Sequence, residues 1–250
     1  MIEFEHVAAA YGKRKIINDV SFIAESGEIT VLFGKNGCGK STLIRTVAGN
    51  LSYSGSILID GTETKRLKPH ERARRLAVMP QILRSPQITV RELVSYGRQP
   101  YTGISGILSK KDNEKVTCAI KNAGIEALAD AYIDRISGGE RQKAYFAMLL
   151  AQDTDNIILD EPGAFLDAEY MNVLCSFLIR AKENGKTVLT VLHDINRTLE
   201  IADKIAVFHE NTVFTVSPQC FVDNQTAERL FNLRRFDCVD ANGKATVLFR

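Results

Sequence analysis

The chain lacks the features that would place it in a membrane or outside the cell. It has no tryptophan and no apolar run that approaches the ~20 residues needed to cross a bilayer. Its first residues, Met1 to Glu5, do not have the pattern of a secretory signal peptide. We therefore predict that any membrane pore with which this chain works belongs to another protein.

Cysteine and charge exclude further classes. The five cysteines are odd in number and include no Cys-x-x-Cys pair, which indicates a reducing compartment without a disulfide or metal framework. The formal net charge is only +2 and no basic block dominates, so charge does not suggest a nucleic-acid partner.

The pattern of apolar residues predicts an α/β protein. With 250 residues and 45% hydrophobic content, the chain can bury a full core as one domain or two lobes. Strand and helix signals alternate over residues 28–49 and again over 156–208, which is typical of a mostly parallel sheet. Between them, residues 88–151 read as three helices. We interpret these helices as an insertion within the core.

The most specific motif is a glycine-rich loop at residues 34–41. It reads Gly-Lys-Asn-Gly-Cys-Gly-Lys-Ser, follows the apolar strand 29–33 and precedes a predicted helix over 41–47. Such a loop turns its backbone N–H groups toward phosphates, and the helix N-terminus adds positive potential. Lys40 would reach the β- and γ-phosphates, and Ser41 would ligate Mg²⁺. The strand and helix on either side disfavour a chance glycine-rich turn.

Two further strands end in polar side chains. The apolar run at 157–159 leads into Asp160 and Glu161, and the run at 187–192 leads into His193. Asp160 would hold Mg²⁺ through water and Glu161 would polarise the attacking water. If the two strands are neighbours, His193 comes near the γ-phosphate. Taken alone, these segments could equally be an acidic turn and a helix cap.

Between these motifs lies Ser137-Gly138-Gly139. Ser137 is a good helix N-cap, and Glu140 completes a capping-box spacing. The helix that follows would aim its N-terminal dipole at an anion. By itself, this stretch is best interpreted as a plain helix cap.

In this order, the motifs resemble the ATP-binding cassette (ABC) family over nearly the whole chain, from Phe4 to about Leu233. The resemblance implies a P-loop NTPase (RecA-like) core with a mostly parallel sheet, an N-terminal antiparallel β subdomain and an inserted helical subdomain. It predicts a single domain, 1–250, with a nucleotide-binding core at 1–87 and 152–216. The helical signature subdomain would be 88–151, and 217–250 would be a C-terminal extension.

The resemblance also assigns residues that the motifs alone do not. Tyr11 would stack on adenine, Gln81 would contact Mg²⁺ or water, and Asp167 would couple the two sites of a dimer. Ser137 and Gly139 would contact the nucleotide of a second copy. The predicted catalytic residues are Glu161, His193, Lys40 and Gln81. The predicted nucleotide-binding residues are Tyr11, Gly34, Lys35, Asn36, Gly37, Cys38, Gly39, Lys40, Ser41, Thr42, Ser137, Gly138, Gly139 and Asp167, and the predicted metal ligands are Ser41, Gln81 and Asp160.

Three positions depart from the family pattern. Gly163 stands where threonine is usual, Glu140 where glutamine is commonest, and Ile136 where leucine is commonest. None of these departures removes a predicted catalytic group.

Segment 88–101 and the Ala151-Gln152 pair are similar to importers of ferric siderophores, haem and cobalamin. The resemblance implies an ATPase homodimer at the cytoplasmic face of the membrane, with a permease and, indirectly, an extracytoplasmic binding protein. The main alternative is a soluble cassette scaffold of the iron–sulfur cluster assembly type, which shares every motif. A DNA-repair ATPase would need a long coiled coil, and no sustained heptad appears here. A metabolite kinase would not explain Ser137 or His193.

Overall fold

The computed structural model describes residues 1–103, 106–163, 168–239 and 245–250. The strands are β1 (Ile2–Tyr11), β2 (Arg14–Ala24), β3 (Ile29–Gly34), β4 (Ser54–Ile59), β5 (Thr62–Glu63), β6 (Leu76–Met79), β7 (Asn156–Asp160), β8 (Thr187–Val191), β9 (Lys204–His209), β10 (Thr212–Val216), β11 (Arg235–Val239) and β12 (Ala245–Phe249). The α-helices are α1 (Lys40–Val47), α2 (Pro69–Arg75), α3 (Val90–Tyr96), α4 (Lys110–Asn122), α5 (Gly138–Gln152), α6 (Ala168–Glu183), α7 (Ile195–Ile201), α8 (Pro218–Asp223) and α9 (Thr226–Phe231).

One sheet runs through the molecule in the order β5-β4-β1-β2-β10-β9-β3-β8-β7-β6. Its β9-β3-β8-β7-β6 half is parallel, and β5-β4-β1-β2 is antiparallel. The two halves are joined through the pairing of Thr212 with Asp19. Strands β7 and β8 are buried along their whole length, which explains their continuous apolar sequences. Because β6, β7 and β8 are neighbours, the residues that follow them meet at one edge of the sheet.

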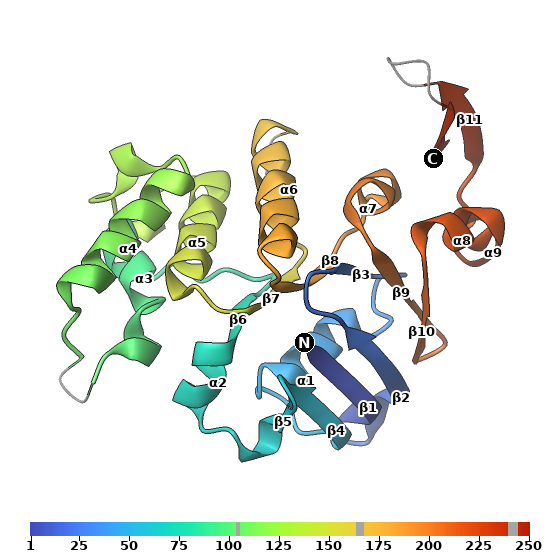
Figure 1. Cartoon of the computed structure of the whole chain (residues 1–250), viewed down its shortest axis with the longest axis horizontal. Coiled ribbons are helices and arrows are strands. Elements are labelled where there is room, and N and C mark those ends of the chain that lie inside the picture. The colour runs from blue at the N-terminus through green and yellow to red at the C-terminus, as the bar shows by residue number, and fades with distance from the viewer. Residues whose placement is uncertain (104–105, 164–167, 240–244) are drawn as a thin grey trace.

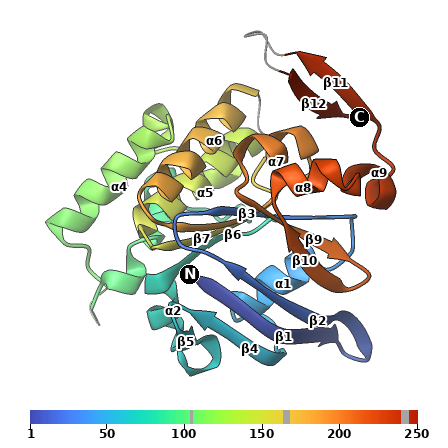
Figure 2. The ribbon, with the colours of Figure 1, turned by 45° about the vertical axis from the view of Figure 1, so that its right-hand side comes forward.

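Helices cover both faces of the parallel half. Figure 2 shows α6, α7 and α8 on one face and α1 on the other. Leu43, Ile44 and Val47 of α1 pack into a core cluster with residues of β1, β2 and β4. The helix that follows the glycine-rich loop is therefore held between the two halves of the sheet.

Helices α3, α4 and α5 gather at one end of the molecule (Figure 1). A buried arginine joins them, because Arg98 Nε donates to Asp112 Oδ1 at 2.9 Å and its Nη1 donates to the carbonyl of Ala151, also at 2.9 Å. Gln152 Nε2 donates to the carbonyl of Ala73 at 2.6 Å, which ties the end of α5 to α2. Within the described ranges, no helix has both the length and the hydropathy needed to span a bilayer.

The C-terminal segment lies at the opposite end (Figure 1). Phe221, Ala227 and Phe249 share a core cluster with Phe33 of β3. The side chain of Asn196 in α7 also holds the hairpin β11–β12: its Nδ2 donates to the carbonyl of Phe249 at 3.1 Å, and the N–H of Phe249 donates to its Oδ1 at 2.9 Å. The side-chain amide of Asn196 thus makes the two backbone hydrogen bonds that a neighbouring strand would make, and it attaches the hairpin to α7.

The architecture confirms the predicted α/β fold with a large, mostly parallel sheet and inserted helices. Helix boundaries differ slightly from the prediction: α1 begins at Lys40, one residue early, and α5 extends to Gln152. The division into 1–87, 88–151, 152–216 and 217–250 stays a prediction.

Candidate functional site

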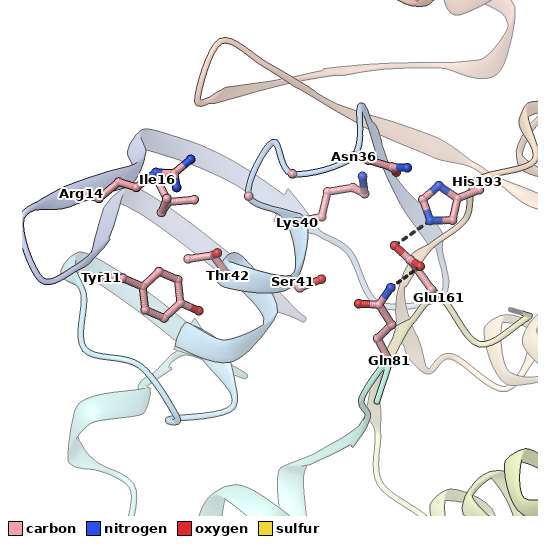
Figure 3. A pocket seen from close by; sticks show the side chains of 12 residues that line it. Tyr11, Arg14, Ile16, Asn36, Lys40, Ser41, Thr42, Gln81, Glu161 and His193 are labelled. Carbon is pink, nitrogen blue, oxygen red and sulfur yellow. Dashed lines mark hydrogen bonds and ion pairs between the residues drawn. The ribbon is translucent and has the colours of Figure 1, made fainter. Parts of the chain in front are cut away.

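A cavity of about 490 Å³ opens between the glycine-rich loop and the ends of β6, β7 and β8 (Figure 3). It is lined by Tyr11, Arg14, Ile16, Asn36, Gly37, Gly39, Lys40, Ser41, Thr42, Gln81, Glu161 and His193. Half of the predicted nucleotide-binding residues and all four predicted catalytic residues therefore line one cavity. Gly34, Lys35, Cys38 and Asp160 do not line it, and Asp167 lies outside the described residues.

Glycine is required in the loop for two different reasons. Gly37 and Gly39 have φ values of 76° and 120°, a backbone region that side chains other than glycine adopt only with strain. At Gly34, an added Cβ would lie 2.9 Å from the backbone oxygen of Phe208 in β9. The loop can therefore turn its N–H groups inward and pass close to the neighbouring strand.

Lys40 already has protein partners. Its side chain is only 5% exposed, and its Nζ donates to the carbonyls of Gly34 at 2.7 Å and Lys35 at 3.0 Å. Cys38 Sγ lies 3.9 Å from the same ammonium. Burial raises the pKa of the Cys38 thiol, so this thiol is neutral at physiological pH. An anion entering the cavity would find one cation already aimed by the loop.

Asp160 closes the end of β7 and is 5% exposed. Burial raises its pKa, and a hydrogen bond from Ser41 opposes that shift. Its Oδ1 has no hydrogen-bond partner among the described residues. A buried, unpaired carboxylate oxygen beside a serine hydroxyl offers the oxygen ligands that Mg²⁺ prefers. These two residues fit a divalent cation.

Glu161 is held between two side chains from the neighbouring strand ends (Figure 3). Gln81 Nε2 donates to Glu161 Oε2 at 2.5 Å, and His193 Nε2 lies 2.6 Å from Glu161 Oε1. Glu161 has a φ of 53°, a conformation uncommon for a residue with a side chain. The structure thus brings together Gln81, Glu161 and His193, which are far apart in the sequence.

Tyr11 stands across the cavity from Glu161 (Figure 3), and its hydroxyl accepts a hydrogen bond from Arg45 Nη1 at 3.1 Å. Arg14 and Ile16 line the same side and were missed by the sequence analysis. A signal for Arg14 was present, because Tyr11 and Arg14 pair directly across the β1–β2 turn. A tight turn directly after Tyr11 places the first residues of the next strand beside it, so they line the same part of the cavity.

Ser137, Gly138 and Gly139 do not line this cavity. Ser137 caps α5: its Oγ accepts from the N–H of Glu140 at 3.2 Å, and Glu140 Oε2 accepts from the N–H of Ser137 at 2.8 Å. This confirms the predicted capping box. The backbone hydrogen bond from Ser137 lowers the pKa of Glu140. At this helix end Ser137 and Gly138 are exposed, and Gly139 is half-buried.

A buried amide side chain links α5 to the end of β7. Gln142 is 4% exposed, and its Nε2 donates to the carbonyl oxygen of Pro162, the residue after Glu161. Next to it, a Cβ placed on Gly163 would lie 1.9 Å from Met171 Cε. The methionine of α6 fills the space that a side chain at 163 would need. A side chain at 163 would therefore require the flexible end of Met171 to move, and no backbone atom among the described residues blocks it.

Comparison with known proteins decides the family. A sequence profile described as ABC transporter matches residues 17–164. The achromobactin transport ATP-binding protein of Dickeya dadantii is 36% identical over 241 residues, which cover 95% of this chain and 88% of that protein. The chain belongs to the ABC transporter family. As an ATP-binding subunit of this family it is an ATPase that binds ATP.

One further relative agrees with this assignment, and one solved structure shares the fold. The ferric enterobactin transport ATP-binding protein of Escherichia coli K12 is 36% identical over 234 residues, or 92% of this ABC ATPase and 86% of that protein. A dimeric ATP-binding cassette solved in a post-hydrolysis state with ADP and Pi has the same fold, with a TM-score of 0.77 and 24% identity over 87% of this chain and 99% of that one.

Proposed function

We propose that this ABC ATPase powers the import of a metal chelate of the ferric-siderophore type through a separate permease. The observation that carries the proposal is the similarity, over most of both chains, to proteins named for the transport of achromobactin and ferric enterobactin. Segment 88–101, which is similar to such importers, supports it. Haem and cobalamin are the other cargoes of this type.

The cavity supports a division of roles among its residues. Lys40 and the N–H groups of residues 34–42 would bind the β- and γ-phosphates, and Tyr11 would pack on adenine. Ser41, Asp160 and Gln81 would hold Mg²⁺, which when bound would neutralise phosphate charge.

Glu161 is the proposed general base. It lies at the end of β7, and its carboxylate oxygens are both occupied, by Gln81 and by His193. To accept a proton from a water molecule, one oxygen has to be released. Gln81 and His193 would then be free to contact Mg²⁺ or water and the γ-phosphate, so the three side chains would rearrange together.

Ser137 and Gly139 support a dimer of this chain. They are exposed or half-buried at the N-terminus of α5 and lie outside the chain's own cavity. We infer that they cap the γ-phosphate bound by a second copy, with Gly138 between them; the family resemblance assigns Asp167 the coupling of the two sites. The dimer would lie on the cytoplasmic face of the membrane, against permease subunits served by an extracytoplasmic binding protein.

The test is coupled transport. The ATPase would be reconstituted in proteoliposomes with the membrane protein that co-purifies with it, and ATP hydrolysis and uptake of radioactive ferric chelate would be measured with loaded binding protein outside. We expect hydrolysis to rise and chelate to accumulate, and both to fail with Glu161→Gln. Purification with a soluble partner alone, and hydrolysis that ignores every chelate, would instead favour the iron–sulfur assembly scaffold, which neither of the relatives named above supports.

A further inference from the structure

The C-terminal hairpin exposes apolar side chains that the proposed function does not use. Phe236 of β11 is 47% exposed and Leu248 of β12 is 44% exposed, and the two residues pair directly across the hairpin. Their opposite face, with Val247 and Phe249, packs on the core. The hairpin therefore packs the β12 side of one face on the core and exposes apolar side chains on the other face.

The two edges of the hairpin differ. The outer edge of β12 is occupied where Asn196 bonds both backbone groups of Phe249. Among the residues that the structure describes, no strand pairs with the outer edge of β11. An unpaired edge is a template for another strand unless charge or distortion protects it.

The register shows which groups this edge presents. Arg234 and Arg250 exchange both of their backbone hydrogen bonds, at 2.6 and 3.0 Å. In an antiparallel pair such residues alternate with residues whose N–H and C=O point away from the partner. Arg235 and Asp237 are therefore the positions whose backbone groups point outward from β11. Their side chains share one face, where Arg235 Nε lies 2.9 Å from Asp237 Oδ1.

We propose that β11 pairs antiparallel with β11 of a second copy, about a two-fold axis at Phe236. In this register Arg235 lies opposite the partner's Asp237, and Asp237 lies opposite the partner's Arg235. Both pairs present outward-facing backbone groups, so four backbone hydrogen bonds form. On the other face Phe236 meets the partner's Phe236 as a close, non-hydrogen-bonded pair, and Leu248 of each copy extends the apolar strip.

Charge selects this register over its neighbours. An axis at Arg235 would place two guanidinium groups opposite each other, and an axis at Asp237 would do the same with two carboxylates. Like charges directly opposite each other destabilise a strand pair. Only the Phe236 axis makes the Arg-Phe-Asp sequence complementary to itself.

This contact is independent of nucleotide. It uses none of the residues that line the ATP cavity or cap α5. The Lys40→Ala chain, which should not bind ATP tightly, is therefore expected to retain it. That difference separates failure of the hairpin contact from failure of the ATP-dependent dimer.

A contact between two short strands is weak between free chains, so disulfide trapping is the suitable assay. In a chain with Cys118, Cys220 and Cys238 changed to serine, Phe236→Cys should form a covalent dimer under mild oxidant without ATP. The matched control is Leu248→Cys. The two copies of that residue would be three strand spacings apart, about 14 Å, which is too far for a disulfide.

Charge exchange then tests the register. Added to Phe236→Cys, Arg235→Asp or Asp237→Arg alone should lower the cross-link severalfold, because each makes the opposing charges alike. Mixing these two chains should restore it as a heterodimer, since every opposing pair is then complementary. A Phe236→Cys yield no higher than that of Leu248→Cys would overturn the proposal. A cross-link yield that is unchanged by Arg235→Asp and by Asp237→Arg would also overturn it, as would a mixture of these two chains that does not recover the cross-link. If the yield is low or insensitive to charge, Arg235 and Asp237 serve only to keep the edge of β11 solvated.

Discussion

The two halves of the proposed ATP site differ in the hydrogen bonds that their residues make within their own chain. In the phosphate half, Lys40 is bonded to loop carbonyls, and Glu161 to Gln81 and His193. If these residues bind and hydrolyse ATP as proposed, the nucleotide and the attacking water have to replace these bonds. In the half at α5, Ser137 and Glu140 cap the first turn of their own helix. That half gives up nothing, so the cost of reorganisation falls on the phosphate half.

The carboxylates of the two halves also respond oppositely to their surroundings. Burial raises the pKa of Asp160, which lacks enough donors to compensate its charge. The backbone hydrogen bond from Ser137 lowers the pKa of Glu140. The carboxylate of Asp160 therefore has an oxygen without a hydrogen-bond donor among the described residues, whereas the carboxylate of Glu140 is stabilised by the N–H of Ser137.

The largest effect should come from the phosphate half. We expect Glu161→Gln to keep ATP binding but to slow hydrolysis by roughly 10²-fold or more, since the proton acceptor is lost. Single-turnover hydrolysis and light scattering with Mg-ATP measure the rate and the trapped dimer. Unchanged turnover with monomer alone would show that Glu161 is not the base.

Lys40→Ala should weaken ATP binding by roughly 10²-fold, because the phosphates lose their aimed cation in a desolvated site. Equilibrium titration with a fluorescent ATP analogue measures the change. Lys35→Ala is the comparison: it keeps the backbone N–H proposed to bind phosphate and the carbonyl that contacts Lys40, so it should weaken binding much less than Lys40→Ala. Near-normal affinity in Lys40→Ala would contradict the assignment.

Ser137→Arg should leave nucleotide affinity unchanged and lower hydrolysis by about tenfold or more, because it obstructs the partner's site and removes one hydrogen-bond donor to the phosphate. Mixing this chain with Lys40→Ala should recover part of the activity through one composite site. The decisive measurement is specific activity against protein concentration for the unchanged chain. Activity that stays constant far below the dimer dissociation constant would mean that each chain is complete.

The smallest effects concern pH. Asp160 has a folded pKa above its unfolded value, so its contribution to stability falls as pH rises through that interval. Glu140 has the reverse order, so its contribution is lost as pH falls through its lowered pKa. Asp160→Asn and Glu140→Gln should each remove one of these opposite slopes, and the slope lost with the more exposed Glu140 should be the smaller. Urea unfolding without nucleotide, from about pH 3 to about pH 7, measures the free energy of unfolding of each chain. If both variants depend on pH in the same way as the unchanged chain, the two carboxylates do not have these opposite effects.

Sequence predicted the parts of the site that are local or follow from strand order. The loop at 34–41 is one strand–turn–helix unit, and the ends of β7 and β8 meet because parallel strands meet at one edge. It did not reveal that Lys40 is bonded to its own loop, because carbonyl direction depends on the exact turn. Nor did it reveal Met171 against Gly163, or Asn196 against Phe249, a contact across 53 residues. Such contacts depend on how helices settle on the sheet.

If two chains form the proposed dimer, the hydrogen bond between Gln142 and Pro162 connects its two sites. Gln142 belongs to the helix that Ser137 caps, and Pro162 follows Glu161, the proposed base of the same chain. If Ser137 touches the partner's nucleotide, each chain senses one ATP with its helix and cleaves another with its carboxylate. Thermodynamic linkage makes such a coupling reciprocal. If nucleotide in the partner's site favours the release of Glu161 from its hydrogen bonds, the release of Glu161 must strengthen nucleotide binding in the partner's site by the same free energy.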